Sequence, residues 1–175
     1  YLKNFKAEIV YIKDNKIRLD QTAFYAKSGG QPGDKGILNY HDDTVEIIDT
    51  IKDNESNILH ISKHNVNLKQ GDKISGHINW DLRYKHMRMH SALHLLCSVV
   101  PFGVTGGQIG FNKSRLDFDL GDNLVSKDEI QEKINELSKE NHKIDYQWIT
   151  QKELDEQPEL VRTMSVKPPK TNNKI

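Results

Sequence analysis

The sequence predicts an α+β protein in which a small N-terminal β-barrel is followed by a two-layer α/β sandwich. Short stretches of alternating apolar and polar residues, separated by Asp, Asn and Gly, fill residues 1–80. From residue 81 onward, helical periodicity alternates with strand-like stretches, as in packed layers of helices and strands. We therefore expect a barrel domain over residues 1–80 and an α+β domain over residues 81–175.

The barrel strands are predicted from their period-two alternation. Phe5–Tyr11 alternates apolar and polar residues, and Asp14-Asn15 gives a turn signal. The other expected strands are Ile17–Leu19, Gly36–Tyr40, Val45–Ile51, Ile58–Ile61 and Lys73–Ile78. Strands of this length suit the wall of a small barrel.

Asp81–Val100 is predicted to be one amphipathic helix that stops before Pro101. It carries His86, His90 and His94 at four-residue spacing, which places them in a column on one face. A helical H-x-x-x-H pair can bind one Zn²⁺ ion, but His86 and His94 lie about 12 Å apart along the axis. The helix can thus supply two metal ligands at most. Cys97 shares their face yet lies about 10 Å from His90, and we expect it to be a buried thiol.

The rest of the second domain is predicted from turn and capping signals. Gly106–Gly110 is expected to be a turn-rich link, and Ser114–Leu120 a strand. Ser126 and Glu129 predict the start of a helix that ends near Asn141, with Ile130, Ile134 and Leu137 as its buried stripe. Ile144, Tyr146 and Trp148 alternate like a strand, and Thr150 with Glu153 predicts a short helix before Pro158.

Phe24–Gly36 is a glycine-rich stretch with two interpretations. It is either an ordinary surface turn or a loop against whose backbone a substrate can lie at Gly29 and Gly30. In the second case Ser28 and Gln31 can hydrogen-bond a substrate hydroxyl or amine. The stretch lacks the G-K-[ST] ending of a phosphate-binding loop.

Composition narrows the class of protein. Lys+Arg and Asp+Glu both number 25, which excludes an overall basic surface, although Arg83, Lys85 and Arg88 could contact phosphates locally. The single cysteine excludes an internal disulfide and fits a reducing compartment, so we expect a cytoplasmic protein. Neither a membrane nor DNA is expected as a partner.

The chain begins at Tyr1 rather than Met, and we expect both ends to have been lost from a longer protein.

Three stretches occur in a specific order: F-Y-x-x-S-G-G-Q-P-x-D-x-G at Phe24–Gly36, R-x-H-S-A-x-H-L-L at Arg88–Leu96, and S-R-L-D-F at Ser114–Phe118. In this the chain resembles the alanyl-tRNA editing proteins of the AlaX group, in their medium-length form, which are relatives of the alanyl-tRNA synthetase editing domain. The resemblance implies a zinc-dependent hydrolase that acts in trans on tRNA(Ala) mischarged with serine, with glycine as a second candidate. It assigns His90 and His94 as zinc ligands.

The family completes its zinc site with a Cys-x-x-x-His pair that this sequence lacks. Either the missing ligands lie beyond Ile175, in which case the second domain is C-terminally truncated, or the site is degenerate. We expect truncation, and we expect a two-ligand site to hold Zn²⁺ weakly or not at all. In this interpretation the residues Ser28, Gly29, Gly30 and Gln31 bind the substrate, and Gln31 recognises the substrate hydroxyl by a hydrogen bond. His86 is then either a support for a ligand or a surface residue.

Two rival functions stay open from the sequence. One is editing of Ser-tRNA(Thr), as in the related domain of threonyl-tRNA synthetases, against which the S-G-G-Q segment argues. The other is a non-catalytic tRNA-binding module that has lost its metal site. A structural zinc protein is less favoured, because a closed site needs four ligands.

Overall fold

The protein is described here by a computed structural model that defines residues 1–145 and 147–164. The chain divides into two compact units. The first consists of Tyr1–Met89 with Ile109–Lys113, and the second of His90–Gln108 with the described residues from Ser114 onward. Within the described ranges, every helix is too short or too polar to cross a bilayer.

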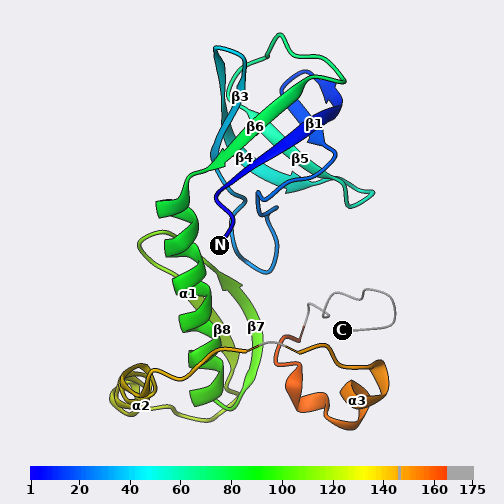
Figure 1. Cartoon of the computed structure of the whole chain (residues 1–175). Coiled ribbons are helices and arrows are strands. Elements are labelled where there is room, and N and C mark those ends of the chain that lie inside the picture. The colour runs from blue at the N-terminus through cyan, green and yellow to red at the C-terminus, as the bar shows by residue number, and fades with distance from the viewer. Residues whose placement is uncertain (146, 165–175) are drawn as a thin grey trace. The chain divides into compact units, whose positions relative to one another are not determined.

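The first unit is built on a closed six-stranded antiparallel barrel (Figure 1). Its strands are β1 (Asn4–Lys13), β2 (Lys16–Leu19), β3 (Gly36–Tyr40), β4 (Asp43–Lys52), β5 (Ile58–Ser62) and β6 (Lys73–Ile78). They follow each other around the barrel in the order β1-β2-β5-β4-β3-β6, and β6 closes it against β1 from Asn4↔His77 to Glu8↔Lys73. The predicted N-terminal β-barrel is confirmed.

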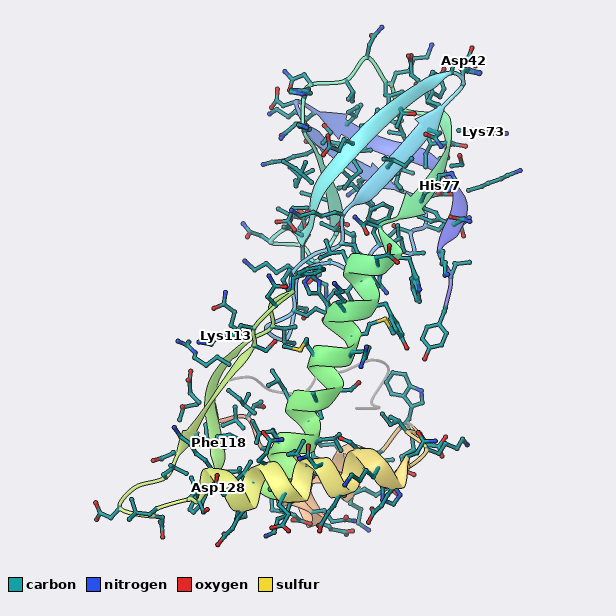
Figure 2. The ribbon with its side chains drawn as sticks, turned by 90° about the vertical axis from the view of Figure 1, so that its left-hand side faces the viewer. Asp42, Lys73, His77, Lys113, Phe118 and Asp128 are labelled. Atoms are coloured by element: carbon teal, nitrogen blue, oxygen red, sulfur yellow. The ribbon has the colours of Figure 1, made fainter. Side chains whose placement is uncertain are left out.

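The alternation seen in the sequence becomes the inside and outside of this barrel. Ile9, Ile17, Leu38 and Ile47 are completely or almost completely buried at its centre. Most outward positions are polar, with Tyr11 and Ile48 as exposed exceptions. Figure 2 shows Lys73 and His77 along β6 and Asp42 at the turn between β3 and β4. Irregular register in β1 between Ile9 and Tyr11, and in β4 between Ile47 and Asp49, gives the bends that help a small barrel close.

Helix α1 (Trp80–Val99) follows β6 directly and agrees with the predicted helix to within one residue at each end. Asn79 begins it: its carbonyl accepts the Arg83 N–H at 3.0 Å, and its side-chain oxygen accepts the Leu82 N–H at 3.2 Å. After Val100, Pro101 cannot continue the helical hydrogen bonding. The helix begins in the first unit and ends in the second.

The second unit combines helices with a two-stranded antiparallel sheet. Its elements after α1 are β7 (Gly103–Gln108), β8 (Arg115–Asp119), α2 (Lys127–Glu140), α3 (Gln151–Glu156) and the 3₁₀ helix η1 (Pro158–Leu160). Figure 2 shows Phe118 on β8. The side chain of Ser126 caps α2, Asn141 ends α2 in the left-handed conformation, and Thr150 and Glu153 form a full capping box at α3. The architecture is therefore α+β, as predicted.

Three details of the second unit differ from the sequence-based expectation. Gly106–Gly110 was expected to be a link, yet Gly106 and Gly107 pair with β8, because backbone hydrogen bonding needs no side chain. No strand forms over the described residues 142–145 and 147–149; Ile144 and Trp148 are exposed, and Tyr146 lies outside the described residues. The apolar stripe of α2 at Ile130, Ile134 and Leu137 is half-buried rather than buried.

Candidate functional site

The S-G-G-Q segment forms a tight turn in the first unit. The Ser28 N–H donates to the Gln31 carbonyl at 3.2 Å, and the Gln31 N–H donates to the Ser28 carbonyl at 2.9 Å. Both central residues have positive φ, 54° at Gly29 and 76° at Gly30. Residues with a Cβ adopt such backbone angles only with strain. The two glycines are thus required by the turn itself, whatever else they do. Ser28, Gly29 and Gly30 are exposed, whereas Gln31 is only 4% exposed.

The base of this turn is fastened to strand β4. The Lys27 N–H donates to the Thr50 carbonyl at 2.8 Å, and the Thr50 hydroxyl donates to the Asp34 carbonyl at 2.9 Å. Gly33 lies so close to the same strand that a Cβ would stand 2.0 Å from the Thr50 carbonyl oxygen. The segment from Lys27 to Asp34 is therefore held at both ends by one residue of the barrel wall.

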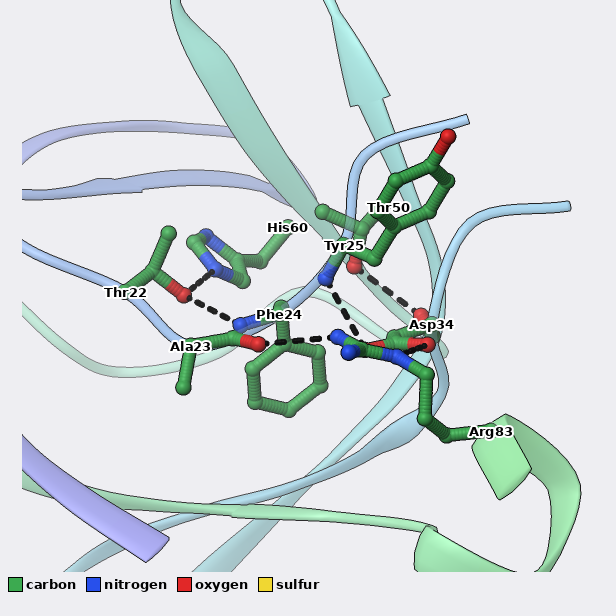
Figure 3. A network of polar contacts seen from close by, with 8 residues as sticks. All are labelled: Thr22, Ala23, Phe24, Tyr25, Asp34, Thr50, His60 and Arg83. Carbon is green, nitrogen blue, oxygen red and sulfur yellow. Dashed lines mark hydrogen bonds and ion pairs between the residues drawn. The ribbon is translucent and has the colours of Figure 1, made fainter. Parts of the chain in front are cut away.

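A buried ion pair ties this segment to α1 (Figure 3). The Arg83 guanidinium contacts both carboxylate oxygens of Asp34 through Nε, at 2.7 and 2.8 Å, and Nη2 also contacts Asp34 Oδ2. Nη2 donates in addition to the Ala23 carbonyl at 2.9 Å. The Asp34 side chain is 1% exposed and that of Arg83 is 15% exposed. Arg83, which was expected to contact tRNA, already uses its guanidinium within the first unit.

The two predicted metal ligands, His90 and His94, belong to the second unit. Their rings stack with centroids 5.0 Å apart and planes 15° from parallel, which their four-residue spacing on one helix face allows. His94 is exposed and His90 half-buried. Burial, together with the neighbouring His94 ring, lowers the pKa of His90 and favours the neutral imidazole, which is the form that binds a metal.

The donor set visible here is incomplete for a metal site. Among residues 1–145 and 147–164, no three His, Cys, Asp or Glu side chains lie close enough together to hold one ion. The pair His90 and His94 fits zinc as two nitrogen ligands. A catalytic zinc site uses three protein ligands and a structural one four. The described residues therefore supply two of the three or four protein ligands that such a site needs.

His86 and Cys97, on the same helix, have different surroundings from the histidine pair. His86 is buried in the first unit, so the alternative that it is a surface residue is wrong. Desolvation lowers its pKa, with Asp34 acting in the opposite direction. Cys97 is half-buried rather than buried as expected, and burial raises the pKa of its thiol in spite of Arg162. A protonated thiol is a poor zinc ligand, so the chemistry of Cys97 agrees with the distance argument against it.

Two of the predicted tRNA contacts remain exposed. Lys85 and Arg88 lie on the surface of α1 in the first unit. The Lys85 ammonium stands 3.9 Å from the centre of the Phe111 ring, which is itself 43% exposed. An exposed cation above an exposed aromatic ring is a surface on which nucleic-acid phosphates and bases can both be bound.

Sequence reasoning missed Asp34 and Arg83 as partners, although both residues lie in stretches that it singled out. They are 49 residues apart, and nothing in either local pattern indicates the other. A second missed network is centred on His60 in β5, which is completely buried. Alternation did not mark this position as inward, because Leu59 and His60 are neighbours in β5 and both are buried.

The chain is similar to several curated proteins over most of its length. It is 37% identical over 186 residues to the alanyl-tRNA editing protein AlaX-M of Methanosarcina acetivorans, covering 94% of this chain and 72% of that protein. It is also 37% identical over 156 residues to AlaX-M of Pyrococcus horikoshii, covering 85% and 70%. The chain belongs to the AlaX family of alanyl-tRNA editing proteins.

AlaX proteins are related to alanyl-tRNA synthetase, and the chain shows this relationship as well. It is 30% identical over 164 residues to the alanine–tRNA ligase of Pyrococcus furiosus, covering 89% of this chain and 18% of that enzyme. Residues 1–82 match the family described as tRNA synthetases class II (A). This match covers the whole barrel of the AlaX chain, including the S-G-G-Q turn.

Proposed function

We propose that the chain is a trans-editing hydrolase that deacylates tRNA(Ala) mischarged with serine, with glycine as a second candidate substrate. The carrying observation is the 37% identity to an AlaX-M editing protein over 94% of the chain. The editing role and tRNA as a partner follow from family membership. The choice of serine, the use of zinc and the assignment of residues are our inference.

The reaction is hydrolysis of an ester. The oxygen of water attacks the carbonyl carbon that joins the amino acid to the terminal ribose. The ester bond breaks and the ribose hydroxyl leaves with a proton, which yields free serine and uncharged tRNA. Zinc, when bound, could hold the amino group of the substrate or lower the pKa of a water toward about 7. His90 and His94 would be two of its ligands, and we expect the Cys-x-x-x-His pair of the family to complete the set.

The Ser28–Gln31 turn is proposed to recognise the misacylated amino acid. An apolar pocket that accepts alanine rejects serine poorly, because serine only adds a hydroxyl. A site built to bond that hydroxyl can reject the analogue without it by about 10⁴-fold. Gln31 and Ser28 carry the side chains able to make this bond. Ser28 is exposed and Gln31 is buried, so each candidate is tested by a substitution of its own.

The test is Ser-tRNA(Ala) deacylation by the full-length protein, with Ala-tRNA(Ala) and Ser-tRNA(Thr) as parallel substrates. We expect rapid hydrolysis of Ser-tRNA(Ala) alone, and loss of its preference over Ala-tRNA(Ala) in Gln31→Ala or Ser28→Ala. Hydrolysis of Ser-tRNA(Thr) instead would move the chain to the threonine branch. Binding of tRNA without hydrolysis would indicate a non-catalytic module.

The metal is tested separately by measuring bound zinc per chain. His90→Ala and His94→Ala should each lower zinc content and deacylation together, and a chelator should reproduce both losses. Cys97→Ala is the matched control on the same helix, and its zinc content should stay at the wild-type level. Full activity after chelation and in His90→Ala would remove zinc from the mechanism.

The tRNA surface is tested by Lys85→Gln and Arg88→Gln, which should raise KM for the tRNA with a smaller effect on kcat.

A further inference from the structure

We propose that Arg83 is a positioning residue of the editing site, which holds the Ser28–Gln31 turn in its working orientation through Asp34 and Tyr25. The inference rests on the proposed function, because it takes this turn to be the part that reads the substrate. It changes the expected role of Arg83 from a phosphate contact to an internal one.

The Ser28–Gln31 turn has little of its own to fix its direction. It is closed by two backbone hydrogen bonds, and its central residues are two exposed glycines. One bond from outside the turn reaches its tip, where the Ile109 N–H donates to the Gly30 carbonyl at 2.9 Å. Glycine has the widest conformational freedom of all residues, so a turn built on Gly29 and Gly30 depends on its base, together with this one bond, for its orientation. A specificity contact tolerates little such movement: a displacement of about 1 Å can cost about 100-fold in rate.

The base of the turn is closed by Tyr25 and Asp34, which meet twice. The Asp34 N–H donates to the Tyr25 carbonyl at 2.9 Å, and the Tyr25 N–H donates to Asp34 Oδ2 at 2.9 Å. The Asp34 carboxylate therefore accepts hydrogen bonds from the Tyr25 backbone N–H and from the Arg83 guanidinium at the same time (Figure 3). Because this carboxylate is almost fully buried, it requires a buried cation as its partner.

Arg83 also contacts the Tyr25 ring, whose hydroxyl is bonded to Ser28 of the turn. The guanidinium carbon lies 5.7 Å from the centre of that ring, which is within the range of a cation–π contact. The Tyr25 hydroxyl donates in turn to the Ser28 carbonyl at 3.0 Å. One side chain of α1 therefore contacts Asp34 at the base of the turn and the Ala23 carbonyl before it, and reaches Ser28 through the Tyr25 ring.

Only arginine has the geometry for all these contacts. Its planar fork binds Asp34 with two nitrogens, donates to the Ala23 carbonyl with the same Nη2, and stacks against an aromatic ring. A lysine would keep the charge but offers a single nitrogen and no plane. Arg83→Lys therefore removes the positioning while leaving Asp34 with a cation.

The experiment uses the full-length protein with two variants, Arg83→Lys and the milder Tyr25→Phe, which removes only the hydroxyl bond to Ser28. Tyr11→Phe is the matched control, because the Arg18 guanidinium stands 5.6 Å from the Tyr11 ring elsewhere on the barrel. Hydrogen exchange is measured at the Ser28 and Gln31 amides and, for reference, at the amides of β4 and β5. Deacylation of Ser-tRNA(Ala) and Ala-tRNA(Ala) is measured as kcat and KM.

We expect exchange at Ser28 and Gln31 to rise about 10-fold in Tyr25→Phe, the factor that corresponds to one lost hydrogen bond, and further in Arg83→Lys. Exchange in β4 and β5 should stay unchanged in Tyr25→Phe. In Arg83→Lys, kcat should fall about 10- to 100-fold and the preference for serine should shrink, with KM within about 2-fold. Tyr11→Phe should match the wild type in every measurement.

If amide exchange rose equally in the turn and in the barrel strands and the preference for serine stayed unchanged, the ion pair would be merely structural. That result would overturn the proposal. Wild-type exchange at Ser28 and Gln31 in both variants would overturn it as well. If the wild-type protein hydrolyses neither tRNA, the proposed function fails, whereas the exchange measurement still decides whether Arg83 positions the turn.

Discussion

His60 makes the stability of the barrel depend on pH in a defined window. Its ring is completely buried, with Nδ1 at 3.1 Å from the Ile17 carbonyl and Nε2 at 2.8 Å from the Thr22 hydroxyl. A carbonyl can only accept, so Nδ1 carries the proton and Nε2 accepts from Thr22. The Phe24 ring packs edge-on against the imidazole at 5.2 Å (Figure 3). The site is therefore built for the neutral form.

Burial lowers the pKa of His60 from 6.5 to about 4, against the effect of the Ile17 hydrogen bond. The unfolded chain then binds a proton at a higher pH than the folded chain does. The contribution of His60 to the free energy of unfolding is fully present above pH 6.5 and is lost as the pH falls toward 4. At about 1.4 kcal/mol per pKa unit, the loss amounts to about 3 kcal/mol at pH 4.

The assay is urea unfolding from pH 4 to pH 7, followed by the fluorescence of Trp80 in a Trp148→Phe background, so that the signal comes from the first unit. His60→Gln keeps a donor and an acceptor but cannot titrate. We expect it to be less stable at pH 7 and to lose about 3 kcal/mol less than the wild type between pH 7 and pH 4. His64→Gln, at an exposed position next to the same strand, is the control and should keep the wild-type slope. Parallel slopes for the wild type and His60→Gln would refute the reasoning.

Three further predictions concern single positions. Gly33→Ala should lower the free energy of unfolding of the barrel by about 2 kcal/mol or more, because its Cβ would meet the Thr50 carbonyl; an unchanged urea midpoint would contradict this. Cys97→Ala should leave zinc content unchanged in the full-length protein, and a drop measured by elemental analysis would make Cys97 a ligand. Thr150→Ala removes the capping box of α3 and should cost about 1 kcal/mol, seen as faster exchange of the Glu153 amide than in wild type, with equal rates speaking against the cap.

The sequence predicted the barrel well because most of its strands place apolar side chains inward at alternate positions, as in β1, β2, β4 and β6. Leu38 and Ile47 are at the centre for that reason, and the turn signals between strands fell where the chain reverses. The predicted strand around Ile144 failed because alternation is necessary but not sufficient: a strand also needs a neighbour to pair with. The strand β7 was missed because glycines such as Gly106 carry no alternation, although their backbone pairs normally.

The candidate site likewise has parts that the sequence predicts and parts that it does not. The Ser28–Gln31 turn and the pair His90 and His94 are local patterns, and the sequence contains all that is needed to find them. The ion pair of Asp34 with Arg83 joins segments that the fold brings together, and no spacing rule connects them. Burial of His60 likewise depends on which face of β5 points inward. Long-range polar partners are the part of a site that a single sequence conceals.

The closure of the barrel by β6 against β1 has a consequence for its synthesis. Asn4 pairs with His77, so the first strand cannot be sealed until the ribosome has released the last one. Until then β1 exposes a row of unsatisfied amides and carbonyls, the feature that invites pairing with other chains. Contacts between such distant residues also slow folding, because a long loop must close first. We therefore expect the nascent barrel to be open to such pairing until β6 is available.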